Sequence, residues 1–123
     1  MTTTTPIDPA DLPAVILAYL TAHRSRDAVA ASSACTDDAV VDDDGHTYRG
    51  RAEIQAWIRD AAAEYDYTAT LTAATRTDDT RYVALHHLEG NFPGGTVDLQ
   101  YRFTLRGDLI ARLVIEPSPD DRR

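Results

Sequence analysis

The spacing of apolar residues changes near residue 66, and this change limits the folds open to the chain. Before it, apolar side chains recur every three or four residues, as at Leu12, Ile16 and Tyr19. After it, they occupy every second position, as at Tyr67, Ala69 and Leu71. The first spacing is typical of amphipathic helices and the second of half-buried strands. Helices followed by a run of strands favour an α+β fold with a mostly antiparallel sheet.

The same patterns predict the individual elements. Helices are expected at 11–23, 27–34 and 51–65, with Asp11 as the N-cap of the first helix and Pro13 in its first turn. A short strand is expected at 39–43. Later strands begin at Tyr67, Arg81, Val97 and Leu109, and are separated by turns at 77–80, 90–95 and 106–108.

Hairpin lengths predict which residues share a face of the sheet. If Gly90 pairs with Gly95, His86 lies opposite Leu99. Similar pairings in the neighbouring hairpins give an inner face that contains Leu71, His86, Leu99, Tyr101, Phe103 and Leu113. A slip of one residue would bring His87 inside instead, so that choice stays open. The outer face then carries an apolar strip, which predicts a homodimer through the sheet: Val83, Leu85, Ile110 and Val114.

Length and charge set the general class. The 123 residues suit one domain, expected at 11–116 between a disordered segment at 1–10 and a flexible tail at 117–123. The net charge of −8 disfavours nucleic acid and anionic membranes as partners. A membrane span and a signal peptide are not indicated, so a cytoplasmic location is expected. The single cysteine, Cys35, is interpreted as a small buried side chain.

Five aspartates lie between positions 37 and 44. On a strand Asp42 and Asp44 share one face and Asp43 takes the other, and alternation alone does not say which face is buried. A calcium loop is disfavoured because Val40 and Arg51 stand where its first and last ligands belong. Adjacent histidines at 86 and 87 face opposite sides of a strand, which disfavours a shared metal. We therefore expect neither a metal nor a cofactor.

Several segments resemble one superfamily. They are AYLTAH at 18–23, TDDAVVDD at 36–43, YRGRAEIQAW at 48–57 and YRFTLRGDLI at 101–110. Together they resemble the nuclear transport factor 2-like superfamily, in its branch of SnoaL-like polyketide cyclases and ketosteroid isomerases. The resemblance implies a cone-shaped fold with N-terminal helices packed in the concavity of a curved sheet.

The resemblance also implies site residues. In the isomerases a helix tyrosine donates a hydrogen bond to the substrate carbonyl and an aspartate moves a proton, and these positions fall on Tyr19 and Asp43. The isomerases' second donor position is Leu99 here, which argues against the same steroid chemistry. His86 could replace that donor, although it could equally be a core histidine. Candidate pocket walls are Trp57, Tyr82, Leu99, Tyr101 and Phe103, whereas His23 and His46 are expected at the surface.

Two functions remain open from the sequence. The first is a cofactor-free acid/base enzyme for a small apolar molecule, of isomerase, cyclase, dehydratase or epoxide-opening type, with Asp43 as base. The second is a non-catalytic dimeric protein of the same fold that binds a small ligand or serves as an accessory protein.

Overall fold

A computed structural model describes residues 4–43, 45–64, 67–91 and 94–117 of the chain. In chain order its elements are β1 (Thr5–Ile7), η1 (Pro9–Asp11), α1 (Ala14–Arg24), α2 (Ala28–Ser33), β2 (Cys35–Asp43), β3 (His46–Arg49), α3 (Gly50–Glu64), β4 (Tyr67–Arg76), β5 (Arg81–Gly90), β6 (Thr96–Arg106) and β7 (Leu109–Pro117). The predicted tail beyond Pro117, Asp44 of the aspartate cluster and the first three residues lie outside the described residues.

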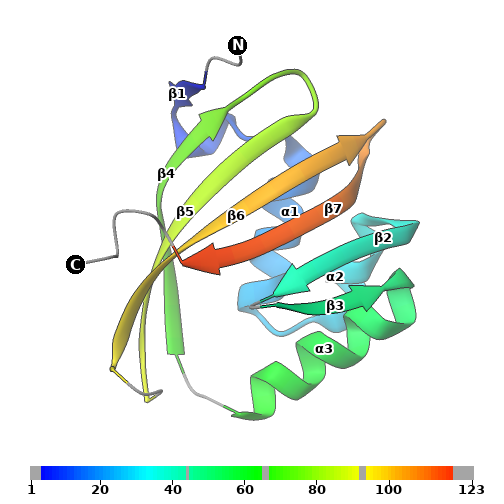
Figure 1. Cartoon of the computed structure of the whole chain (residues 1–123), viewed down its shortest axis with the longest axis vertical. Helices are drawn as coiled ribbons and strands as arrows, with labels where there is room; N and C mark the ends of the chain where they lie inside the picture. Colours follow the sequence, from blue (N-terminus) through cyan, green and yellow to red (C-terminus); the bar gives the residue numbers. More distant parts are fainter. Residues whose placement is uncertain (1–3, 44, 65–66, 92–93, 118–123) are drawn as a thin grey trace.

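The seven strands form one curved sheet in the order β1-β4-β5-β6-β7-β2-β3. All neighbouring strands run antiparallel except β2 and β7, which run parallel. Figure 1 shows α1 crossing one face of the sheet behind β6 and β7, and α3 lying beside β3. The predicted α+β architecture, with helices against a mostly antiparallel curved sheet, is confirmed.

The start of the chain differs from the prediction. Thr5–Ile7 pairs with β4, where the sequence analysis expected a disordered segment. The first long helix begins at Ala14 with Pro13 as its N-cap, and not at Asp11. The reason is local: Leu12 precedes a proline, which disfavours helical geometry, and its ψ is 147°. Asp11 instead ends a short turn that Asp8 caps by accepting a hydrogen bond from the Ala10 amide.

The hairpin registers agree with the prediction in part. His86 faces Leu99 and Leu71 faces His86, as predicted, the second pair with the help of a β-bulge between Leu71 and Ala73. The last hairpin is shifted by two residues, so Phe103 faces Leu113 rather than Ala111. A shift of two keeps every side chain on its predicted face.

The assignment of Ile110 to the outer face is wrong. The register of β6 and β7 shifts between Thr104 and Leu105, so that Thr104 pairs with Arg112 but Leu105 with Ile110. The extra residue, Ala111, reverses the alternation at this end of β7. Ile110 is therefore buried, with 1% of the residue's surface exposed, and its amide donates to the Ala34 carbonyl.

Arg51 fixes α3 to the second strand. Its guanidinium donates to the Cys35 carbonyl at 2.7 Å and pairs with Asp37 at 2.7 Å. Gly50 has a φ of +83°, which lets the chain pass directly from β3 into α3 without a linking loop. These contacts join the first turn of α3 to the start of β2. None of the described helices is long and apolar enough to cross a bilayer.

Candidate functional site

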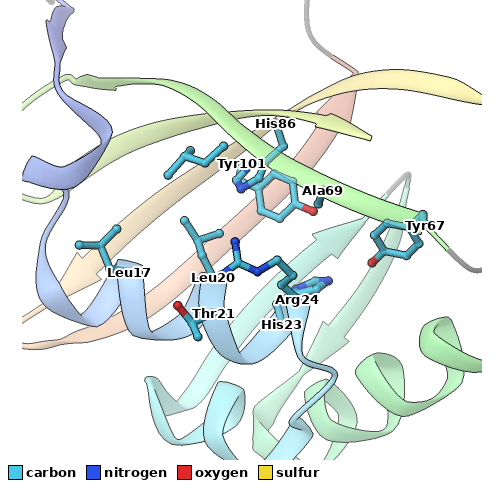
Figure 2. Close-up of a pocket in the computed structure, with 10 residues that line it drawn as sticks. Leu17, Leu20, Thr21, His23, Arg24, Tyr67, Ala69, His86 and Tyr101 are labelled. Carbon is cyan, nitrogen blue, oxygen red and sulfur yellow. The ribbon is translucent and has the colours of Figure 1, made fainter. Parts of the chain in front are cut away.

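A pocket of about 170 Å³ opens between α1 and the inner face of the sheet. Side chains of α1 form one wall and side chains of β4, β5 and β6 form the other (Figure 2). Its lining residues are Leu17, Leu20, Thr21, His23, Arg24, Tyr67, Ala69, Leu71, His86 and Tyr101. The pocket is thus mostly apolar, with two imidazoles, two phenols and one guanidinium, as expected of a small-molecule site.

Behind this wall, the Tyr19 hydroxyl forms a 2.9 Å hydrogen bond with Nδ1 of His23. Tyr19 is fully buried, and this burial first, with the charge of Asp43 among lesser causes, raises the pKa of its phenol well above the usual value. The hydroxyl therefore keeps its proton, and Nδ1 of His23 is the acceptor found for it among the described residues. A neutral His23 must then carry its own proton on Nε2.

His23 is neutral because it is surrounded by nonpolar groups. Burial first, and the nearby His86 second, lower the pKa of His23 to about 4. The ring packs edge-on against Trp57 and Tyr101, with centroid separations of 5.2 Å and 6.0 Å. His23 therefore lines the pocket, although the sequence analysis expected it at the surface. Its spacing of four residues from Tyr19 on one helix face is the signal that could have identified it.

His86 lies on the pocket side of β5 and is 7% exposed. Its ring stacks at a tilt on Tyr101, with 4.4 Å between centroids, while His87 points to the other side and bonds Asp98. Burial first, with the charge of Arg24 also contributing, lowers the pKa of His86 to about 4. Its Nδ1 is buried and has no hydrogen-bond partner among the described residues. A buried polar atom without a hydrogen bond destabilises a folded protein by about 1–3 kcal/mol, so a partner for this atom would be favourable.

Asp43 ends β2 on the inner side. Val41, two residues earlier, is buried, whereas Asp42 points outward and pairs with Arg112. Nε1 of Trp57 donates to a carboxylate oxygen of Asp43 at 3.0 Å, and Trp57 in turn stacks on Tyr48. The tryptophan thus fixes the Asp43 carboxylate at the edge of the aromatic cluster around His23.

The charge of Asp43 reaches the pocket. Burial is the main reason that the pKa of Tyr101 and that of Tyr67 lie above the usual value, and the charge of Asp43 raises both further. Both phenols line the pocket and both keep their protons at neutral pH. The site therefore combines one carboxylate with several neutral hydrogen-bond donors.

The predicted site residues fall into three groups. His86 and Tyr101 line the pocket itself. Asp43 and Trp57 lie beside it, joined to each other. The remaining four pack in or against the core behind it: Tyr19, Tyr82, Leu99 and Phe103. The hydroxyl of Tyr19 thus contacts His23, whereas the resemblance implied that it would contact a ligand directly.

Arg24 and Tyr67 are among the lining residues that were not predicted from the sequence. Arg24 follows Leu17 by seven residues on α1, so it extends the same helix face to the mouth of the pocket. Tyr67 begins the alternating segment whose inner face was predicted, but its hydroxyl was not considered. Among the described residues, three or more His, Cys, Asp or Glu side chains do not gather in a way that could hold a metal ion.

Comparisons with known proteins agree with this geometry. The model of the SnoaL-like domain family matches residues 16–113. A candidate polyketide cyclase from Sinorhizobium meliloti is 32% identical, with 89% of this chain and 100% of that chain covered and a TM-score of 0.82. No curated protein matches the chain.

Two further structures share the fold at lower identity. A ketosteroid isomerase-like protein from Catenulispora acidiphila, solved with trimethylamine, is 21% identical, with coverage of 89% and 88% and a TM-score of 0.77. A candidate polyketide cyclase from Xanthomonas campestris is 20% identical, with coverage of 86% and 89% and a TM-score of 0.73. These two likenesses concern the fold alone.

Proposed function

This chain belongs to the SnoaL-like domain family, and from that premise we propose that it is a cofactor-free acid/base enzyme acting on a small, mostly apolar molecule. The observation that carries the proposal is the combination of Asp43 with neutral donors around one pocket. The candidate polyketide cyclase from Sinorhizobium meliloti, which is 32% identical to this chain, supports the same class of chemistry. The reaction is an isomerisation, aldol-type cyclisation, dehydration or epoxide opening.

Asp43 is the base in this proposal. Its carboxylate takes a proton from a carbon next to a substrate carbonyl, and the Trp57 N–H holds the carboxylate in one orientation. Returning the proton to another carbon completes an isomerisation. In a cyclisation the enolate attacks a second carbonyl of the same molecule, and Asp43 returns its proton to the alkoxide that forms there. General base catalysis of this kind contributes roughly 10²–10⁴-fold in rate.

Neutral donors stabilise the charge that develops on the carbonyl oxygen. His23 offers Nε2–H because Tyr19 occupies its Nδ1. Tyr101 and Tyr67 offer hydroxyls from the opposite wall, and His86 is a further candidate. Fixed donors in a site with little water stabilise an oxyanion more strongly than they would in bulk solvent. Tyr19 thereby becomes a positioning residue rather than a donor to the substrate.

A second candidate function is a non-catalytic binding protein. One observation favours it: the Asp43 carboxylate bonds Trp57 and is not among the residues that line the pocket. In that case Asp43 would hold α3 against β2, and the pocket would bind its ligand without converting it.

Asp43→Asn separates the two functions because an amide oxygen can still accept the Trp57 hydrogen bond while the basic carboxylate is lost. Asp42→Asn is the matched control, since Asp42 lies on the same strand but faces away. The enzyme hypothesis predicts turnover of an enone, epoxide or polyketide-like probe that falls at least about 100-fold in Asp43→Asn alone. If no probe is turned over and both variants bind ligands like the native protein, the binding function stands instead.

A further inference from the structure

Arg24 is the charged residue of the pocket at neutral pH. The two lining histidines are neutral, because burial lowers the pKa of each to about 4. The lining contains no carboxylate. Arg24 has no hydrogen bond or ion pair among the described residues, even though the chain carries 20 acidic residues. Arg24 therefore places a positive charge on the lining of the pocket, in a chain whose net charge is −8, whereas the charge of Asp43 acts on Tyr67 and Tyr101 from outside the lining.

The side chain of Arg24 extends along the pocket, so its charge acts on the pocket as well as on solvent. Figure 2 shows its side chain extending along the pocket beside Leu20, toward the space beneath Tyr101. Its charge acts on His86 on the opposite wall. An arginine fork suits a planar oxyanion, which it can bind through two parallel hydrogen bonds.

His86 gives an independent observation on the same pocket. The residue is more than nine-tenths buried, and its Nδ1 has no partner among the described residues. A buried polar atom of this kind is usually satisfied, so one without a protein partner beside a pocket is suited to a ligand atom. Leu17, Leu20 and Leu71 supply apolar surface to the same pocket.

We infer that the ligand of this pocket carries a planar oxyanion, such as a carboxylate or an ionised 1,3-dicarbonyl group, on an otherwise apolar ring system. Arg24 pairs with the oxyanion at the mouth, the leucines contact the ring, and His86 bonds a polar atom deeper inside. This inference names a substrate class and rests on the proposed function only for the claim that the ligand is a substrate.

Binding measurements test the inference without any turnover. 2-Naphthoate and 2-naphthamide share one ring system and differ in the charge of one substituent. Calorimetric titration of the native protein should give an affinity for the carboxylate at least about fivefold higher than for the amide, a modest ratio because Arg24 is partly hydrated. The preference should shrink as salt concentration rises.

Variants assign the preference to one residue. Arg24→Gln should abolish it, and Arg24→Lys should keep part of it, because lysine retains the charge but lacks the fork. Arg59→Gln on the exposed side of α3 is the control and should leave it unchanged. Equal affinities in the native protein, no saturable binding of 2-naphthoate at millimolar concentration, or a preference that survives Arg24→Gln would each overturn the inference. Asp43-dependent turnover would be untouched by any of these results.

Discussion

The Tyr19 hydroxyl and Nδ1 of His23 lie 2.9 Å apart, one helical turn from each other on α1. Because Tyr19 is completely buried, its hydroxyl has to donate a hydrogen bond to an acceptor inside the protein, and that acceptor is His23. The hydrogen bond therefore sets the tautomer of a pocket residue. The tyrosine that would contact substrate in the isomerases lies here in the core behind the pocket. His23 lines the pocket and presents a hydrogen-bond donor in its place.

Tyr19→Phe should release this tautomer. We expect native His23 to be protonated on Nε2 alone, and the variant to contain both tautomers, as seen in the ¹⁵N chemical shifts of the ring. Loss of the buried hydrogen bond should also lower the free energy of unfolding by about 1–2 kcal/mol. Tyr82→Phe is the control, because the Tyr82 hydroxyl has no hydrogen bond among the described residues. A native His23 protonated on Nδ1 would contradict the proposed role.

The bond between Trp57 and Asp43 should be measurable as a coupling energy. Trp57→Phe keeps an aromatic ring against Tyr48 and His23 but removes the N–H donor. A double-mutant cycle with Asp43→Ala cancels the change in ring volume and isolates the pair. We expect a coupling of about 1–2 kcal/mol in urea unfolding, since the acceptor is a carboxylate. Additive effects of the two changes would show that the hydrogen bond does not hold Asp43 in place.

The two pocket histidines should make stability depend on pH between about 4 and 6.5. In the unfolded chain each has a pKa of about 6.5, whereas burial lowers the pKa of each to about 4 in the folded chain. The unfolded state therefore binds more protons in this window, and the free energy of unfolding falls as pH decreases through it. The loss is on the order of 2–3 kcal/mol per histidine by pH 4.

Two variants check that assignment. His86→Gln should make the decline between pH 6.5 and 4 shallower, as measured by urea unfolding at a series of pH values. His87 acts in the opposite direction: hydrogen bonds to Asp98 and Glu89 raise its pKa, so it stabilises the fold at low pH. That contribution is fully present below the unfolded pKa of about 6.5 and is lost as pH rises above it, so His87→Gln should leave the decline between pH 6.5 and 4 almost unchanged. A decline that His86→Gln leaves unchanged would assign the pH dependence to other groups.

The sequence was informative where local chemistry decides the outcome. The change of period at residue 66 marks the start of the consecutive strands β4 to β7, and hairpin lengths bring His86 inside opposite Leu99. One β-bulge was a source of error. A bulge at Ala111 turns Ile110 into the core, and alternation by itself gives no sign of it.

The composition of the pocket was harder to predict because it depends on how α1 docks on the sheet. Periodicity identifies the buried stripe of α1 but not which part of its edge remains open to a cavity. His23 and Arg24 lie on that edge, where a helix face changes from core to pocket. Tyr19 lies at the centre of the stripe, so it is sealed in the core although the resemblance implies ligand contact.

The outer face of the sheet still predicts a homodimer, although Ile110 is buried in the core and does not belong to this face. Val83 and Val114 flank Arg102 on adjacent strands, and Leu85 lies further along the same face. Arg102, between the two valines, forms an ion pair with Glu116, and Arg112 forms one with Asp42. Arginine is enriched at protein interfaces, so this mixture of valines, a leucine and paired arginines suits a contact between two copies.

Light scattering coupled to size exclusion should therefore give a dimer mass at micromolar concentration. Val83→Arg should shift the mass to that of a monomer, because it places a second guanidinium beside Arg102 in the interface. Val29→Arg is the matched control, since Val29 is 63% exposed on α2, away from the sheet. A native protein that elutes as a monomer, or a Val83→Arg variant that remains dimeric, would exclude this face as the contact between two copies.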